Sequence, residues 1–154
     1  MKRRSMGAAF ALTLALSPLC AHAQQAPTPS PAQAGRWVTE SGNLEVDIAP
    51  CGEAWCGTVT QVLANRSMSA PGETMDAADK RPALGMKILT DLRLVDEGAL
   101  SGEIYNRENA KTYSVRLTMD GPQQMLVRPY IGLPLFGKTQ LWHRVPANSP
   151  EAKP

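Results

Sequence analysis

The chain has 154 residues, of which 43% are hydrophobic and 19% charged, and it contains 12 glycines and 13 prolines. This length and composition favour one turn-rich globular domain and exclude a charged disordered chain. The formal charge of +2 depends on Lys2, Arg3 and Arg4, because the rest of the chain has 13 cationic and 14 acidic side chains, so we expect no nucleic-acid partner.

The first 23 residues have the pattern of a cleaved secretory signal peptide. Residues 2–4 are cationic, residues 6–19 form an apolar run, and residues 21–23 place small side chains where a signal peptidase cleaves. The apolar run is shorter than the ~20 residues that cross a bilayer, and Pro18 interrupts it. We therefore expect a periplasmic protein, exported through residues 1–23, that does not span a membrane.

The segment after the signal, residues 24–34, is polar and rich in proline, and residues 146–154 have a similar composition. We expect a flexible leader and a disordered tail there, because such segments have little apolar surface to bury. The folded domain is therefore predicted over residues 35–145, which is long enough for a modest hydrophobic core.

Inside this domain hydrophobic and polar residues alternate with a period of two, which is typical of half-buried strands. Leu44, Val46 and Ile48 share one face of one strand, and Ile88 shares a face with Leu94 in another. Short turns separate most of the runs, which favours antiparallel neighbours. Eight strands are expected, over residues 36–40, 43–49, 56–63, 84–95, 99–105, 111–119, 124–131 and 138–145.

The predicted fold is therefore all-β, a single up-and-down antiparallel barrel of about eight strands. Such a barrel closes on itself and leaves no free strand edge, whereas an open sandwich, the alternative, would leave edges to protect.

Cys51 and Cys56 are the cysteines that remain once Cys20 is removed with the signal. An even pair in an oxidising compartment predicts a disulfide, which contributes about 2 kcal/mol for so short a loop in the chain-entropy model. A redox-active pair is disfavoured because four residues separate the cysteines, and a metal site because His143 is the only histidine left. Lipidation of Cys20 is a weaker alternative because the preceding Leu19 is bulky.

The disulfide also suggests a register for the hairpin around it. If Cys51 opposes Cys56, Val46 opposes Gln61 and both lie on the inner face. Gln61 would then need a polar partner in an apolar interior, either a protein group, a water or a ligand. A bulge in either strand would cancel this inference.

Residues 64–82 form a long connection rich in small and polar side chains, with no periodicity. Loops of this length in a compact domain are usually lids, binding loops or disordered segments. We favour a flap over one barrel mouth, with Met68 and Met75 as its apolar contacts. An idle surface loop is the alternative.

Residues 129–137 are nine consecutive residues without a charge. They either plug one end of the barrel from within or form an exposed apolar patch for a partner or a membrane surface. We favour the plug.

Several short motifs of the domain, taken together and in order, are similar to one known family. They are Gly35-Arg36-Trp37, Cys51…Trp55-Cys56-Gly57, Arg81-Pro82-Ala83-Leu84-Gly85-Met86-Lys87-Ile88-Leu89, Gly102-Glu103-Ile104-Tyr105-Asn106, Lys111-Thr112-Tyr113 and Leu135-Phe136-Gly137-Lys138-Thr139-Gln140-Leu141-Trp142-His143-Arg144. They resemble the bacterial domain-of-unknown-function 2147 family of small exported proteins, over nearly all of residues 35–145. The resemblance implies export and carries no established activity. The chain has Asn109-Ala110 where the family usually makes a turn with Asp-Gly or Asn-Gly.

The chain also resembles lipocalin-type barrels, which place Gly-x-Trp on the first strand and an arginine near the end of the last. Gly35, Trp37 and Arg144 occupy those places. The resemblance implies that Trp37 and Arg144 close one barrel end, with the guanidinium over the indole, rather than contact a ligand.

Catalysis has little support in the sequence. No nucleophile motif such as Gly-x-Ser-x-Gly, no phosphate loop and no dinucleotide fingerprint is present. We therefore expect neither an enzyme nor a cofactor or metal. A convergent carboxylate cluster stays open as an alternative, because its members would meet only in the fold.

The leading interpretation is an exported, non-enzymatic, lipocalin-like barrel that binds a small hydrophobic or amphipathic ligand. The alternative is an interaction module of the cell envelope with a filled barrel, which binds a protein through residues 129–137 or 64–82. The candidate ligand-binding residues are Val46, Val59, Gln61, Met86, Ile88, Tyr113 and Val115.

Overall fold

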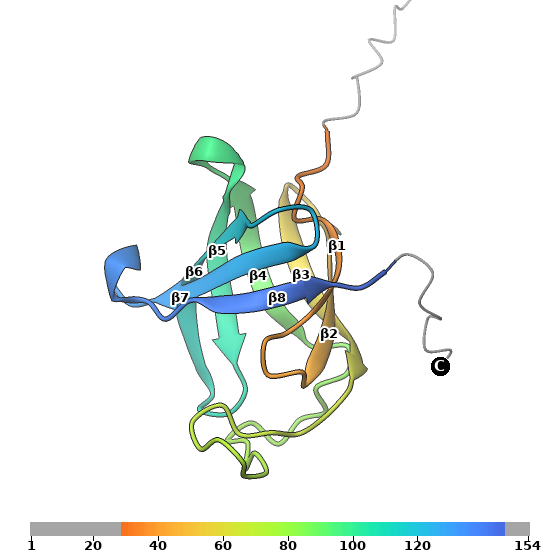
Figure 1. Cartoon of the computed structure of the whole chain (residues 1–154), viewed down its shortest axis with the longest axis vertical. Helices are drawn as coiled ribbons and strands as arrows, with labels where there is room; N and C mark the ends of the chain where they lie inside the picture. Colours follow the sequence, from red (N-terminus) through yellow and green to blue (C-terminus); the bar gives the residue numbers. More distant parts are fainter. Residues whose placement is uncertain (1–28, 147–154) are drawn as a thin grey trace, which may run out of the picture.

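The computed structural model describes residues 29–146, which form one closed barrel of eight antiparallel strands (Figure 1). Each strand pairs with the next along the chain, and the last returns to the first. The strands are β1 (Gly35–Val38), β2 (Leu44–Cys51), β3 (Ala54–Val62), β4 (Lys87–Leu94), β5 (Leu100–Asn106), β6 (Lys111–Met119), β7 (Gln124–Tyr130) and β8 (Gln140–Arg144). The predicted up-and-down barrel is confirmed. The expected signal peptide, residues 24–28 of the leader and residues 147–154 of the tail lie outside the described residues.

The inward faces of the strands form one hydrophobic core. The alternation predicted for the sixth strand is present in β6, where Val115 and Leu117 are fully buried and Tyr113 and Met119 pack against the core. The core residues are Trp37, Val46, Ile48, Val59, Ile88, Leu89, Leu92, Leu100, Ile104, Val115, Leu117, Met125, Val127 and Trp142. In the described residues no helix is long and apolar enough to cross a membrane.

The predicted disulfide between Cys51 and Cys56 is present, with the Cα atoms 5.8 Å apart. The register inferred from it is wrong, because Cys51 pairs with Ala54 across a turn in which Gly52 has a positive φ of 74°. The disulfide therefore links residues that are not directly opposite each other.

This tighter turn changes the partners along the whole hairpin. Val46 pairs with Val59 instead of Gln61, and an irregularity between Glu45 and Val46 then places Gln61 opposite Glu45. A bulge was expected to cancel the inferred register, and an irregularity of this kind is present further along the hairpin.

A second irregularity changes which side chains of β4 face the interior of the barrel. The register with β5 shifts between Thr90 and Arg93, and Asp91 adopts a positive φ of 49°. As a result Leu89 is fully buried and Leu94 is 65% exposed, so the expectation that Leu94 shares the inner face is wrong. A Cβ atom on Gly102 of β5 would lie 2.6 Å from the carbonyl oxygen of Thr90, so this close approach requires glycine.

One end of the barrel is closed by Trp37, Arg144 and Gln33. The guanidinium carbon of Arg144 lies 4.2 Å from the centroid of the Trp37 ring, and its nitrogens donate to three backbone carbonyls. The Trp37 indole donates to the carbonyl oxygen of Gln33, whose fully buried side chain donates to the carbonyl oxygen of Gly98. Gln33 belongs to the segment expected to be a flexible leader, and here it is buried at the closed end of the barrel.

Candidate ligand-binding cavity

The other end of the barrel holds a cavity of about 380 Å³. It begins where β1 ends and β8 begins, and residues from every strand except β1 contribute to its walls. This volume lies within the range of small-molecule sites in proteins, roughly 300–1,000 Å³. The large apolar and aromatic residues of the lining are Leu44, Val62, Met68, Met75, Ile88, Ile104, Tyr105, Tyr113, Tyr130, Ile131, Phe136 and Trp142.

Apart from Ala64, Ala83 and Pro129, the rest of the lining is polar and includes two cationic residues. Arg107 comes from the β5–β6 turn and Lys138 from the β7–β8 connection, and no Asp or Glu is among the lining residues. The uncharged polar residues are Thr39, Ser41, Asn43, Asn65, Asn106 and Gln140. The walls therefore combine a large apolar surface with a few polar groups, which is the usual composition of a ligand pocket.

The long loop between β3 and β4, residues 63–86, lies across this end of the barrel and is called the lid below (Figure 1, yellow-green). It contains the predicted long loop 64–82. Met68 and Met75 line the cavity, where a flap was expected to place them. Three sets of side-chain hydrogen bonds hold the lid to the rest of the barrel, in addition to backbone bonds between Val59 and the last residues of the lid.

Asn43 provides the first set. Its side-chain amide donates to the carbonyl oxygen of Arg66 at 2.8 Å and accepts from the Arg66 N–H at 2.8 Å. Its backbone carbonyl accepts from Leu63 and Ala64. Asn43 is only 4% exposed, so these bonds satisfy a buried amide and hold the beginning of the lid.

Glu108, in the β5–β6 turn, provides the second set. Its carboxylate accepts from the Ser67 hydroxyl at 2.6 Å, from the Ser69 hydroxyl at 2.8 Å and from the Met68 N–H at 3.1 Å. Partial burial raises the pKa of Glu108, but the hydrogen bonds from Ser67 and Ser69 outweigh it and hold the pKa below its ordinary value. The charged carboxylate thus fixes the tip of the lid.

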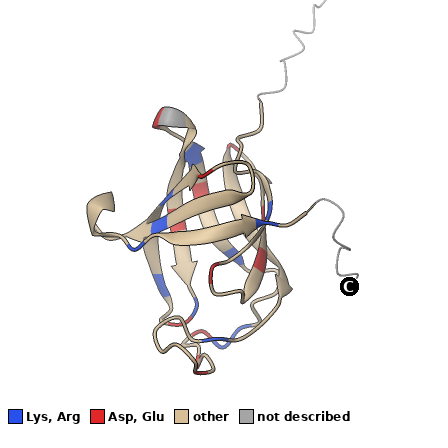
Figure 2. Cartoon of the chain, in the orientation of Figure 1, with Lys and Arg blue, Asp and Glu red and all other residues tan. Residues whose placement is uncertain are grey.

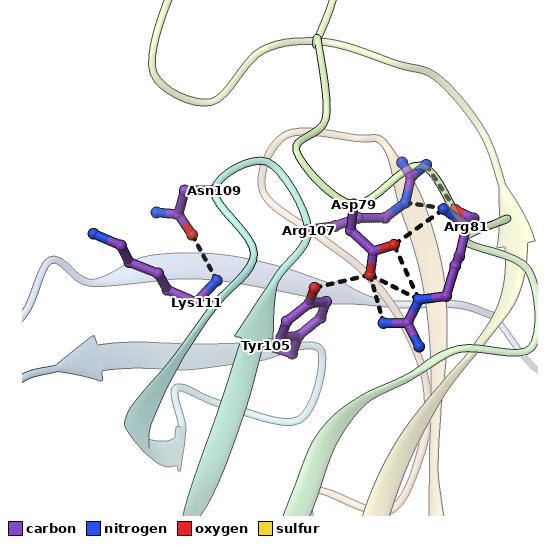
Figure 3. Close-up of polar contacts among 6 residues, drawn as sticks. All are labelled: Asp79, Arg81, Tyr105, Arg107, Asn109 and Lys111. Carbon is purple, nitrogen blue, oxygen red and sulfur yellow. Dashed lines mark hydrogen bonds and ion pairs between the residues drawn. The ribbon is translucent and has the colours of Figure 1, made fainter.

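The third set surrounds Asp79 near the end of the lid (Figure 3). Its carboxylate is 9% exposed and accepts from the Arg81 guanidinium at 2.5 to 3.1 Å and from the Tyr105 hydroxyl at 2.8 Å. Arg107 donates through Nε and Nη2 to the backbone carbonyl of Arg81, at 3.1 and 2.9 Å. The Arg81 side chain, its backbone N–H and Tyr105 together hold the pKa of Asp79 well below its usual range.

The candidate residues predicted from the sequence are divided between the cavity and the core. Ile88 and Tyr113 line the cavity. Val46, Val59 and Val115 are buried in the core, and Met86 packs against that core. Gln61 is half-buried on β3 and does not line the cavity.

The lid contacts and the two cationic residues were not among the sequence candidates. Asp79 lies in an aperiodic loop, 26 positions before Tyr105 at the end of β5. It meets Tyr105 and Arg107 only because the lid folds onto the β5–β6 turn. The length of the loop was the one feature of the sequence that pointed to a functional role for this segment.

The uncharged segment 129–137 does not plug the barrel. Leu133, Leu135 and Phe136 are 61%, 78% and 76% exposed, so the favoured plug is wrong and the alternative, an exposed apolar patch, is what the structure has. The short helix η2 (Pro134–Phe136) projects from the end of β7, and Figure 2 shows no charge on it. Arg128 donates to the carbonyl oxygens of Pro134 and Leu135, which holds this turn against β7.

Metal ligands do not gather in the part of the chain that the structure describes: residues 29–146 hold no group of three or more His, Cys, Asp or Glu side chains that could bind an ion. Figure 2 shows the charged residues scattered over the barrel and the lid rather than collected on one face.

The chain is similar to one family of known sequences and, in fold, to a solved structure. The family model described as "Uncharacterized protein conserved in bacteria (DUF2147)" matches residues 35–144. Among solved structures, the chain is similar to protein HP1028 from Helicobacter pylori, described as belonging to the lipocalin family. The TM-score is 0.55 at 19% identity, over 74% of this chain and 83% of that one, which is a likeness of fold. No curated protein matches the chain.

Proposed function

The chain belongs to the bacterial DUF2147 family and folds as a lipocalin-like barrel, and on this basis we propose that it is an exported, periplasmic protein that binds a small hydrophobic or amphipathic molecule. The observation that carries the proposal is the cavity of about 380 Å³ with largely apolar walls. An exposed apolar cavity in water costs free energy that a ligand with apolar surface would recover.

The lid gives the proposal further support. Met68 and Met75 line the cavity, and methionine side chains adapt to irregular apolar shapes. The hydrogen bonds of Asn43, Glu108 and Asp79 hold the lid in place, so little conformational entropy would be lost when a ligand enters.

The periplasmic location is supported by two features. The Cys51–Cys56 disulfide is stable in oxidising compartments and rare in the cytoplasm. Residues 1–23 have the pattern of a signal peptide. Expression of the full chain in a bacterium, followed by fractionation and intact-mass measurement, should recover a periplasmic product that lacks residues 1–23. A cytoplasmic product of full mass would contradict export.

Binding is tested by native mass spectrometry of the protein purified from periplasm, with organic extraction of whatever purifies with it. We expect a stoichiometric small molecule. The Val62→Trp variant should lose it, because Val62 lines the cavity and tryptophan would fill its mouth. Leu94→Trp is the matched control, since Leu94 is exposed on β4 and does not line the cavity. Equal recovery of the molecule from both variants would place it elsewhere and contradict the proposal.

A second candidate function is supported by the exposed patch of residues 131–136. Ile131, Leu133, Leu135 and Phe136 are all more than 60% exposed, and a contiguous patch of this kind is typical of an interaction site. The function would be docking onto a protein of the cell envelope. A photo-crosslinking amino acid at Leu135 should then capture one defined envelope protein, while the same group at Leu94 should not. Identical patterns at the two positions would argue against this candidate.

A further inference from the structure

The cationic residues of the cavity are not neutralised by acidic neighbours. Asp79, a carboxylate of the lid, pairs with Arg81. Glu108 is charged, but its oxygens are enclosed by residues 67–69 and it is not part of the cavity lining. The lining therefore contains Arg107 and Lys138 as its only charged residues.

Arg107 is held in place by a neutral acceptor, so its positive charge is not balanced by that contact. Two of its N–H groups donate to the carbonyl oxygen of Arg81, a neutral acceptor, which leaves further guanidinium donors for another partner. Among the described residues, no carboxylate lies within ion-pair distance of Arg107. A guanidinium fixed by two hydrogen bonds and with spare donors suits an oxyanion better than a lysine in the same place would.

Lys138 adds a second positive charge at the mouth of the cavity. It is exposed, forms no ion pair with another described residue, and follows the apolar segment that contains Phe136, which also lines the cavity. The long flexible stem of a lysine lets its ammonium group follow a ligand at the entrance, whereas Arg107 is fixed.

The volume limits the size of the ligand. If each non-hydrogen atom takes about the ~30 Å³ that a water molecule takes in the liquid, the cavity holds roughly a dozen of them. This is about the size of a carboxylate with a chain of about ten carbons.

From these observations we propose that the cavity selects amphiphiles with an anionic head group, of the class of medium-chain carboxylates, and that Arg107 and Lys138 bind the head group while the apolar walls take the chain. This inference rests on the proposed function and adds the ligand class to it. It excludes uncharged and cationic amphiphiles of the same length as preferred ligands, because only an anion gains electrostatic free energy from two cations that have no acidic partner among the described residues.

Three compounds with the same ten-carbon chain test the proposal: decanoate, 1-decanol and decyltrimethylammonium. Their binding to the mature protein is measured by titration calorimetry at low and moderate salt. Decanoate should bind about tenfold more tightly than the alcohol, and the difference should shrink as salt is added. Decyltrimethylammonium should bind most weakly.

The variants separate the head group from the chain. Arg107→Gln and Lys138→Gln should each weaken decanoate binding severalfold and leave decanol binding unchanged, and Arg107→Lys should restore part of it. Arg116→Gln is the matched control, because Arg116 lies on β6 and donates to the carbonyl oxygen of Asp96 rather than lining the cavity. Unchanged decanol affinity also shows that the Arg107 variants keep the lid closed.

The outcomes distinguish ligand binding from selectivity for an anionic head group. If none of the three compounds binds a correctly folded protein, the proposed function fails together with this inference. If decanol binds as tightly as decanoate, or if Arg107→Gln weakens both equally, the cavity binds amphiphiles but the anionic selectivity is overturned.

Discussion

Arg144 stacks over Trp37 at the closed end of the barrel, 4.2 Å from the ring centroid, and the two residues are also direct partners in the pairing of β8 with β1. The same guanidinium reaches the carbonyl oxygens of Ala32, Ala34 and Pro122. One side chain thus connects the first strand, the last strand, the segment before the barrel and the β6–β7 turn.

Replacing Arg144 with methionine should therefore lower the free energy of unfolding by about 2–4 kcal/mol, from the cation–π contact and the three hydrogen bonds. Urea denaturation followed by tryptophan fluorescence measures the change. Arg116→Met, on the outer part of β6, serves as the control and should cost less than about 1 kcal/mol. Equal losses in the two variants would show that Arg144 does not close the barrel energetically. Ligand binding at the other end should persist in both.

The disulfide is expected to stabilise the fold and leave the cavity unaffected. The Cys51→Ala, Cys56→Ala double variant should lose about 2 kcal/mol of unfolding free energy, because the unfolded chain gains freedom around the β2–β3 turn. Reduction of the wild-type protein should give a similar loss. Ligand affinity measured on the same samples should change by less than twofold, since neither cysteine lines the cavity. A large loss of affinity would mean that the turn and the cavity are coupled.

Ala110→Gly should stabilise the protein. Ala110 adopts a positive φ of 55° in the β5–β6 turn, a conformation that costs a residue with a Cβ atom about 1–2 kcal/mol and glycine almost nothing. Part of that gain is lost to the greater freedom of glycine in the unfolded chain, which leaves roughly 0.5–1 kcal/mol. Thermal unfolding measures the difference. Ala49→Gly, in the ordinary extended backbone of β2, should change stability in the opposite direction.

Asp79→Asn should weaken the lid in a way that depends on pH. The folded protein holds the pKa of Asp79 well below its ordinary value, chiefly through the side chain of Arg81. Such a carboxylate stabilises the fold above its unfolded pKa of about 3.9 and loses that contribution as the pH falls. The difference in unfolding free energy between the wild type and D79N should therefore be largest near pH 6 and shrink towards pH 3.

Hydrogen exchange locates the effect of this substitution. Amides of the lid should exchange faster in Asp79→Asn than in the wild type, and those of β6 should not change. Asp120→Asn, in the β6–β7 turn, removes a carboxylate far from the lid and should leave lid exchange as it is. A pH-independent difference between D79N and wild type would contradict the role given to the Asp79 charge.

The strands and their order could be predicted because the barrel needs nothing beyond a period of two and short turns between neighbours. The bulges could not. Whether a strand bends at Asp91 depends on the approach of Gly102 from β5, and whether Gln61 meets Val46 depends on the size of the turn at Gly52. These are contacts between strands, and alternation within one strand carries no information about them.

The candidate residues were chosen by apolar parity, and this choice names none of the charged residues of the cavity. Parity alone did not distinguish the cavity lining from the rest of the core, so Ile88 belongs to the core and also lines the cavity, whereas Val46, with the same pattern, does not line it. The plug expected from Leu133 and Phe136 failed for a different reason. A lack of charge indicates only that the segment is hydrophobic. Its direction depends on Arg128 of β7, which donates hydrogen bonds to the carbonyl oxygens of Pro134 and Leu135.

The lid is attached to the barrel by side chains at only three places, while the fully packed core lies nearer the closed end. Side chains between these attachment points, such as Ala70, Glu73 and Thr74, can therefore be randomised with little effect on folding, whereas Gly72 is kept because its φ is 90°. A combinatorial library over this stretch, with Asn43, Glu108 and Tyr105 retained, offers a small disulfide-bonded scaffold on which new small-molecule receptors can be selected.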